Sequence, residues 1–149
     1  MKTAEDILKE KNKEMICVTP GTSIFDAART MVVNNIGSVI VKEGDTIHGI
    51  YTERDFLHDS VKEGCDLRNS PVRDYMTCNL IFASYDDPLY KLQDMMLGMR
   101  IRHLLIQKDN RYIGLLSAGD VTRASLNESE KQIKSVSWSY YEDWKWKKK

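Results

Sequence analysis

The chain contains one sequence pattern twice, at positions 65 residues apart. The segment Gly49-Ile50-Tyr51-Thr52-Glu53-Arg54-Asp55 recurs as Gly114-Leu115-Leu116-Ser117-Ala118-Gly119-Asp120, with glycine, hydroxyl residue and aspartate at the same spacing. The offset holds without a gap from 18–56 to 83–121, although only four of these 39 pairs are identical. An unbroken register of residue classes over this length predicts two copies of one structural unit.

Both copies predict the same order of elements. The first predicts a strand at 15–18, a helix from Ile24, strands at 38–42 and 46–51, and a helix over about 52–62. The second predicts a strand at 80–83, a helix from Pro88, strands at 102–107 and 112–116, and a helix from about 117. The order is therefore β-α-β-β-α twice, which indicates the α+β fold class.

The helix boundaries carry recognisable signals. Thr22 and Ser23 are good N-cap residues before Ile24. Asp87 followed by Pro88 predicts a cap and a proline in the first helical position. The helix after Pro88 is expected to bury one stripe of side chains, formed by Leu89, Leu92, Met96 and Met99.

Size and charge limit the possible classes of protein. A copy of about 60 residues has a marginal core by itself, so the two copies are expected to pack on each other. The net charge of zero gives no global field that would favour nucleic acid or a membrane. The N-terminal segment 1–10 alternates charged and apolar residues, unlike a signal peptide, and no apolar run is long enough to span a bilayer.

The three cysteines predict neither a disulfide framework nor a metal site. Cys17, Cys65 and Cys78 are odd in number and widely spaced, so they are expected to be buried small hydrophobic residues in a protein of the reducing cytosol. His48 and His58 have no partner at metal-ligand spacing. No nucleophile with its base and no cofactor loop is visible, so an enzyme is not expected.

The repeated segments resemble a tandem pair of CBS domains, the arrangement called a Bateman module. The resemblance also rests on residues 35–41 and 100–106, and on Val72-Arg73-Asp74-Tyr75-Met76-Thr77 as the entry into a second repeat. Asp6-Ile7-Leu8 corresponds loosely to Asp74-Tyr75-Met76, at an offset of 68. The predicted organisation is repeat 1 at 3–64, a linker at 65–71, repeat 2 at 72–124, and a helical extension with an aromatic and basic tail at 125–149.

The resemblance implies two βαββα units about a pseudo-two-fold axis, with clefts between them. In this family such clefts commonly bind AMP, ADP or ATP, and sometimes S-adenosylmethionine or a dinucleotide such as NAD. Members usually sense rather than catalyse, and often form flat dimers. A stand-alone pair of this kind is expected to be a regulatory signalling module that binds an adenosine nucleotide and acts on a protein partner or on its own homodimer.

The repeated segments also suit a nucleotide by their chemistry. Thr52 and Ser117 stand where a strand ends and a helix begins, so free N–H groups and the helix dipole favour a phosphate. Asp55 and Asp120 follow within the first turn, where a carboxylate can accept hydrogen bonds from a ribose diol. The same four residues can equally be simple helix caps and helix-start carboxylates.

Other residues complete the predicted site. Gly49 and Gly114 are expected to leave room for a ligand or for the other repeat. Glu53 in only one copy makes the two sites electrostatically unequal, which predicts the less encumbered site at Ser117 and Asp120. The predicted phosphate-neutralising residues are Arg54, Arg102 and His103, and the predicted adenine walls are Val39 and Leu104.

The last 25 or so residues leave a second interpretation open. They hold Trp138, Trp144 and Trp146 together with lysines, a combination that can bind nucleic acid or a membrane interface. The alternative, packing of these aromatics on the body or on a partner copy, is favoured because the tail is short and also contains acidic residues. A structural assembly module with vestigial clefts therefore remains the alternative to a nucleotide sensor.

Overall fold

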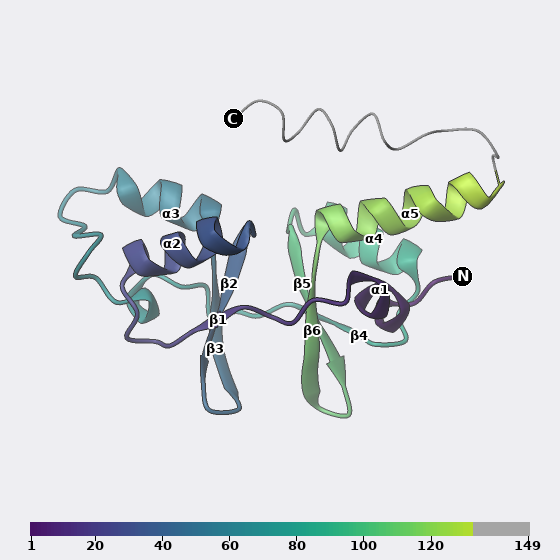
Figure 1. Ribbon diagram of the computed structural model, residues 1–149, viewed down its shortest axis with the longest axis horizontal. Coiled ribbons are helices and arrows are strands. Elements are labelled where there is room, and N and C mark those ends of the chain that lie inside the picture. Colours follow the sequence, from purple (N-terminus) through teal and green to yellow (C-terminus); the bar gives the residue numbers. More distant parts are fainter. Residues whose placement is uncertain (133–149) are drawn as a thin grey trace.

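The computed structural model describes residues 1–132, which form two similar units side by side (Figure 1). The first unit contains β1 (Cys17–Val18), α2 (Ile24–Asn34), β2 (Ser38–Glu43), β3 (Thr46–Thr52) and α3 (Glu53–Ser60). The second contains β4 (Phe82–Ser84), α4 (Leu89–Gly98), β5 (His103–Lys108), β6 (Arg111–Ser117) and α5 (Ala118–Gln132). Helix α1 (Ala4–Lys11) and a 3₁₀ helix (Val72–Asp74) precede these two series. The α+β class and the β-α-β-β-α order of both copies are confirmed.

Each unit has one three-stranded sheet with the same pairing. β1 runs parallel to β2 and β2 antiparallel to β3, and β4, β5 and β6 pair in the same way. The first hairpin breaks register between Val41 and Lys42, and the second between Ile106 and Gln107. These positions are equivalent at the offset of 65, so the sequence register extends to the irregularity of the sheets.

The two faces of each sheet bury different partners. Val39 and Val41 of β2 point into a cluster with Met31 of α2. Ile40 lies between them in the strand, is fully buried, and belongs to neither unit's own cluster. Because strand side chains alternate, Ile40 and its counterpart Leu105 face the space between the two sheets, which stand next to each other in Figure 1. We call this face between the sheets the seam.

The segment before each first strand packs on the other unit. Ala4 and Ile7 of α1 belong to the core of the second unit, and Val72 is fully buried in the core of the first. Equivalent backbone hydrogen bonds hold both segments, from Ala4 N–H to the Asp87 carbonyl (2.9 Å) and from Val72 N–H to the Thr22 carbonyl (2.7 Å). The N-terminal part of each sequence repeat therefore completes the neighbouring unit.

The two repeated glycines lie where the exchanged segments cross the strands. A Cβ atom at Gly49 would lie 2.8 Å from Sδ of Met76, and one at Gly114 would lie 2.6 Å from Cδ2 of Leu8. Leu8 and Met76 are paired by the 68-residue offset, which confirms the correspondence of the two segments. The two glycines were predicted to leave room for a ligand or for the other repeat. The structure shows that they leave room for the segment from the other repeat.

The start of α4 differs from the prediction. Asp87 does not cap the helix: Pro88 is itself the N-cap, without a side-chain hydrogen bond. The Asp87 carboxylate instead accepts hydrogen bonds from Ser84 N–H (2.9 Å) and from the Lys91 ammonium (2.6 Å). Pro88 occupies the position of Ser23, whose hydroxyl does cap α2. The second unit therefore lacks this cap.

The buried stripe of α4 is shorter than predicted. Leu89, Leu92 and Met96 are buried as expected, but Met99 is 53% exposed. The helix ends at Gly98, and Met99 is the C-cap residue. Because the helix ends before Met99, helical spacing no longer places this side chain over the core.

The cysteines differ in part from the prediction. All three are free thiols, but Cys17 and Cys78 are exposed and only Cys65 is half-buried. Cys17 lies in the two-residue strand β1, and Cys78 lies in the segment leading to β4. Within residues 1–132 no helix is long and apolar enough to cross a membrane.

Candidate functional site

Both repeated segments form the same hydrogen-bonded cap at a strand–helix junction. The Thr52 hydroxyl accepts a hydrogen bond from Asp55 N–H (3.2 Å), and the Asp55 carboxylate accepts one from Thr52 N–H (2.9 Å). Ser117 and Asp120 make the equivalent bonds at the start of α5, at 3.2 and 2.8 Å. The capping role of all four residues is thus confirmed, and their contact with a ligand stays a prediction.

Asp120 has an additional partner from a distant part of the chain. The Lys11 ammonium donates hydrogen bonds to Oδ2 of Asp120 (2.8 Å) and to the Leu115 carbonyl (2.9 Å). The side chains are 23% and 18% exposed, so the pair is largely shielded from water. Burial acts to raise the pKa of Asp120, but the hydrogen bonds from Lys11 and Ser117 outweigh it and hold this pKa below its ordinary value.

The exchange of N-terminal segments explains how Lys11 reaches the site. Lys11 is the last residue of α1, and Asn12 ends the helix in the left-handed conformation, with φ of 44°. Because α1 packs on the second unit, its C-terminal end arrives beside the start of α5. Lys11 was not among the predicted site residues, although the 68-residue offset between the two entry segments contained the signal.

His103 lies in the electrostatic field of both repeated aspartates. Burial is the main cause that lowers its pKa to about 4, and Lys11 adds to this effect, while Asp120 and Asp55 oppose it. His103 is therefore neutral at neutral pH. It can offer a hydrogen bond to a phosphate, but it does not carry the positive charge that the prediction assigned to it.

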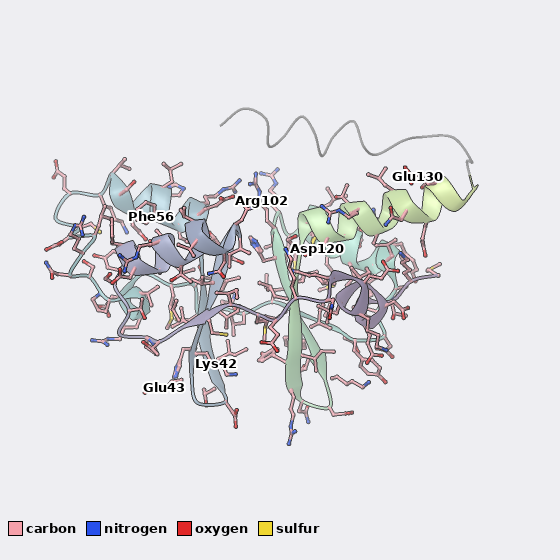
Figure 2. All side chains as sticks on the ribbon, viewed as in Figure 1. Lys42, Glu43, Phe56, Arg102, Asp120 and Glu130 are labelled. Carbon is pink, nitrogen blue, oxygen red and sulfur yellow. The ribbon has the colours of Figure 1, made fainter. Side chains whose placement is uncertain are left out.

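The two predicted arginines are both exposed and differ in surroundings. Arg54 lies in the first turn of α3, whereas Arg102 precedes β5 and its carbonyl accepts a hydrogen bond from Ala118 N–H (2.8 Å). Neither arginine forms an ion pair with any part of the chain that the structure describes. Figure 2 shows Arg102 and Asp120 near the seam, at its helical end, so Arg102 is free to approach an anion there.

Val39 and Leu104 cannot wall a ligand between the units. Both are fully buried, and each packs in the core of its own unit. The prediction placed them on the wrong face of the strand, because side chains alternate and it is Ile40 and Leu105 that face the seam. An apolar surface for an adenine at the seam therefore has to come from the strand face that carries Ile40 and Leu105.

Two hollows on the surface of the described residues are lined by residues outside the repeated segments. One is lined by residues of α4, α5 and Met1, and the other by Cys17, Thr19, Thr22, Thr30 and Lys42, among others. Neither includes Thr52, Asp55, Ser117 or Asp120.

Comparison with known proteins identifies the family. The CBS domain profile matches the chain twice, over residues 4–62 and 72–127, which together are most of its length. The chain belongs to the CBS domain family. It is a CBS pair, in which the two profile matches correspond to the two β-α-β-β-α series.

Relatives of this CBS pair include stand-alone CBS proteins. The mitochondrial CBS domain-containing protein CBSX3 of Arabidopsis thaliana is 33% identical over 90% of this chain and 69% of its own length. A crystal structure of a CBS-domain-containing protein from Agrobacterium tumefaciens is 30% identical, with a TM-score of 0.79, covering 83% of this chain and 99% of that one.

A more distant solved CBS pair contains a nucleotide. A CBS domain protein from Pyrobaculum aerophilum, complexed with AMP, is 20% identical with a TM-score of 0.74 and covers 87% of this chain and 99% of that one. At this identity the likeness shows the shared fold. The predicted aromatic tail of the present CBS pair, including Trp138, Trp144 and Trp146, lies outside the described residues.

Proposed function

We propose that this CBS pair is a cytosolic regulatory module that binds an adenosine nucleotide between its units and transmits occupancy to a protein partner or to its own dimer. AMP, ADP and ATP are the first candidates, and S-adenosylmethionine and NAD the next. The observation that carries the proposal is that both repeated segments place a hydroxyl residue and a carboxylate together at a helix start beside the seam. The AMP complex of a protein with the same fold supports it.

The mechanism follows from what the segments can offer. Thr52 would donate to a phosphate oxygen, as would Ser117 once its hydroxyl turns away from Oδ2 of Asp120, and Asp120 and Asp55 would accept from the ribose hydroxyls. A ligand that bridges the seam contacts both units, so it favours the arrangement of units that suits those contacts. Its effect on a partner is limited to its difference in affinity for the two arrangements.

A thermal-shift series tests nucleotide binding. A ligand at about 100 times its dissociation constant stabilises the native state by about 2.7 kcal/mol, so the best of the five compounds is expected to raise Tm by roughly 5 °C or more. Asp120→Ala or Asp55→Ala is expected to abolish that shift at its own site. The ligand-induced change in Tm is compared, because losing the cap alone lowers Tm by removing about 1 kcal/mol.

Asp94→Ala is the matched control for that series. Asp94 is an exposed carboxylate on α4, so its loss is expected to leave the ligand-induced shift intact. An absence of any shift in the folded wild-type protein, with every compound, would argue against nucleotide sensing. Function would then rest on assembly.

Exposed apolar side chains favour assembly into a dimer as part of the same function. Val32 and Val61, at the ends of α2 and α3, are 78% and 80% exposed. Their equivalents at the offset of 65, Leu97 and Leu126, are also exposed. Figure 1 places α2, α3, α4 and α5 at the end opposite the hairpin tips, and we propose that a second copy covers the exposed apolar side chains there.

The dimer is tested by light scattering after size-exclusion chromatography. The wild-type protein is expected to elute as a dimer, and Val32→Lys combined with Leu97→Lys is expected to give monomers, because lysines would be buried without partners. Ile113→Lys, at an exposed apolar position in β6, is the control that should stay dimeric. A monomeric wild-type protein would contradict the proposal of self-association.

A further inference from the structure

The surroundings of the two repeated aspartates differ in charge at equivalent positions. Glu53 N–H donates to the Gly37 carbonyl (3.0 Å), as Ala118 N–H donates to that of Arg102 (2.8 Å). Glu53 of the first unit thus corresponds to Ala118 of the second, and Gly37 corresponds to Arg102. Directly before the aspartate, Arg54 corresponds to Gly119.

The exchanged segments add a second difference. Lys11 follows Leu8 by three residues, and the equivalent residue after Met76 is Asn79, which is uncharged. The first site therefore has the carboxylates of Asp55 and Glu53 and the guanidinium of Arg54. The second site has the carboxylate of Asp120, the ammonium of Lys11 and the guanidinium of Arg102. The net charge of these groups is therefore positive at the second site and negative at the first.

Lys11 still has hydrogen-bonding capacity in the paired state. An ammonium has three N–H donors, and the structure uses two of them, toward Asp120 and the Leu115 carbonyl. Oδ2 of Asp120 accepts all of its hydrogen bonds, while Oδ1 accepts none from the part of the chain that is described. A ligand can thus place a hydroxyl on Oδ1 and an anionic group on Lys11 without breaking the ion pair.

We propose that Lys11 is a specificity-determining residue of the second site, where it selects adenosine compounds that carry a phosphate over those that do not. The inference rests on the proposed function and deepens it. Lys11 supplies a phosphate contact that is held in place by Asp120, at the end of the seam where Figure 2 also shows Arg102. The first site, with Asn79 and Glu53, has no equivalent cation from its exchanged segment.

Calorimetric titration with AMP and with adenosine tests this inference. The two probes differ only in the phosphate, and an Asp55→Ala background leaves the second site alone to be measured. Lys11→Met removes the ammonium and keeps the length of the side chain. It is expected to weaken AMP binding about tenfold or more and to change adenosine binding less than about twofold, because the hydrogen bond that it removes from the phosphate is charge-assisted.

Two further variants separate charge from structure. Lys11→Arg keeps the charge and is expected to restore most of the preference for AMP. Lys9→Met removes a lysine of the same helix that is 68% exposed and pairs with Glu5, and it is expected to leave both affinities unchanged. Circular dichroism confirms that each variant is folded.

The possible failures are distinguishable. If Lys11→Met weakens AMP and adenosine by the same factor, Lys11 is only structural and the inference is wrong, and the same holds if AMP binding is unchanged. In both cases the wild-type protein binds a nucleotide and the proposed function stands. If the wild-type protein binds neither AMP nor adenosine at any concentration tested, the inference is wrong, and the thermal-shift series with the other four compounds then decides whether the proposed function stands.

Discussion

Replacing Gly49 with alanine is expected to destabilise the protein by about 3 kcal/mol, the upper part of the range for overpacking a well-packed site. The added Cβ would lie 2.7 Å from the Thr77 carbonyl oxygen and 2.8 Å from Sδ of Met76. The Thr77 backbone cannot easily move away, because its carbonyl and N–H both form hydrogen bonds with Ile50, at 3.0 and 2.9 Å. The clash therefore separates the exchanged segment from β3.

The change in the free energy of unfolding is measured by urea unfolding followed by far-UV circular dichroism, and variants at two other glycines serve for comparison. Gly114→Ala is expected to cost less, about 1 kcal/mol, because its nearest neighbour is the movable end of the Leu8 side chain. Gly98→Ala is expected to be neutral or slightly stabilising, because no atom lies within 4 Å of the new Cβ. A Gly49→Ala protein as stable as the wild type would show that the exchanged segment is not tightly packed there.

Replacing Tyr51 with phenylalanine is expected to destabilise the protein by about 3 kcal/mol. The Tyr51 hydroxyl donates a hydrogen bond to Oδ2 of Asp59 (2.9 Å), and both side chains are buried. Burial and this bond to Asp59 raise the pKa of Tyr51. Without the hydroxyl, Asp59 would keep only the distant Lys62 ammonium at 3.8 Å, so a buried carboxylate would lose its main partner.

The second unit supplies the design of the control for this pair. Its equivalents of Tyr51 and Asp59 are Leu116 and Ala124, which are buried and apolar. Tyr51→Phe combined with Asp59→Ala is therefore expected to cost less than the sum of the single changes, with a coupling of about 1–3 kcal/mol. Asp59→Asn keeps an acceptor and should cost less than Asp59→Ala. Additive costs would mean that the hydroxyl and the carboxylate do not stabilise each other.

The larger elements could be predicted because their signals are local and occur twice. The β-branched run in 38–42 and the helical spacing of Ile24, Ala27 and Met31 each depend on a few neighbouring residues. The capping function of Thr52 and Ser117 is equally local, because their partners are three residues away. Two copies in one register strengthened each of these interpretations.

The errors fall where a local pattern allowed more than one outcome. An N-cap and a first helical position differ by one residue, which was enough to place Asp87 and Pro88 wrongly. Alternation predicts that Val39 and Ile40 face opposite sides, but it does not say which side meets the helices. The exposure of Cys17 depends on what packs over a two-residue strand, which no short segment encodes.

The amino-acid sequence by itself determined the two β-α-β-β-α units, their strand and helix order, and the capped aspartates that begin α3 and α5. Tertiary structure alone decided which unit each N-terminal segment completes, and hence why Gly49 and Gly114 must be glycine and how Lys11 reaches Asp120. The physical reason is the separation along the chain of the residues that interact. Caps and periodicity are satisfied within a few residues, whereas the Lys11–Asp120 pair joins positions 109 residues apart, and packing between the units brings them together.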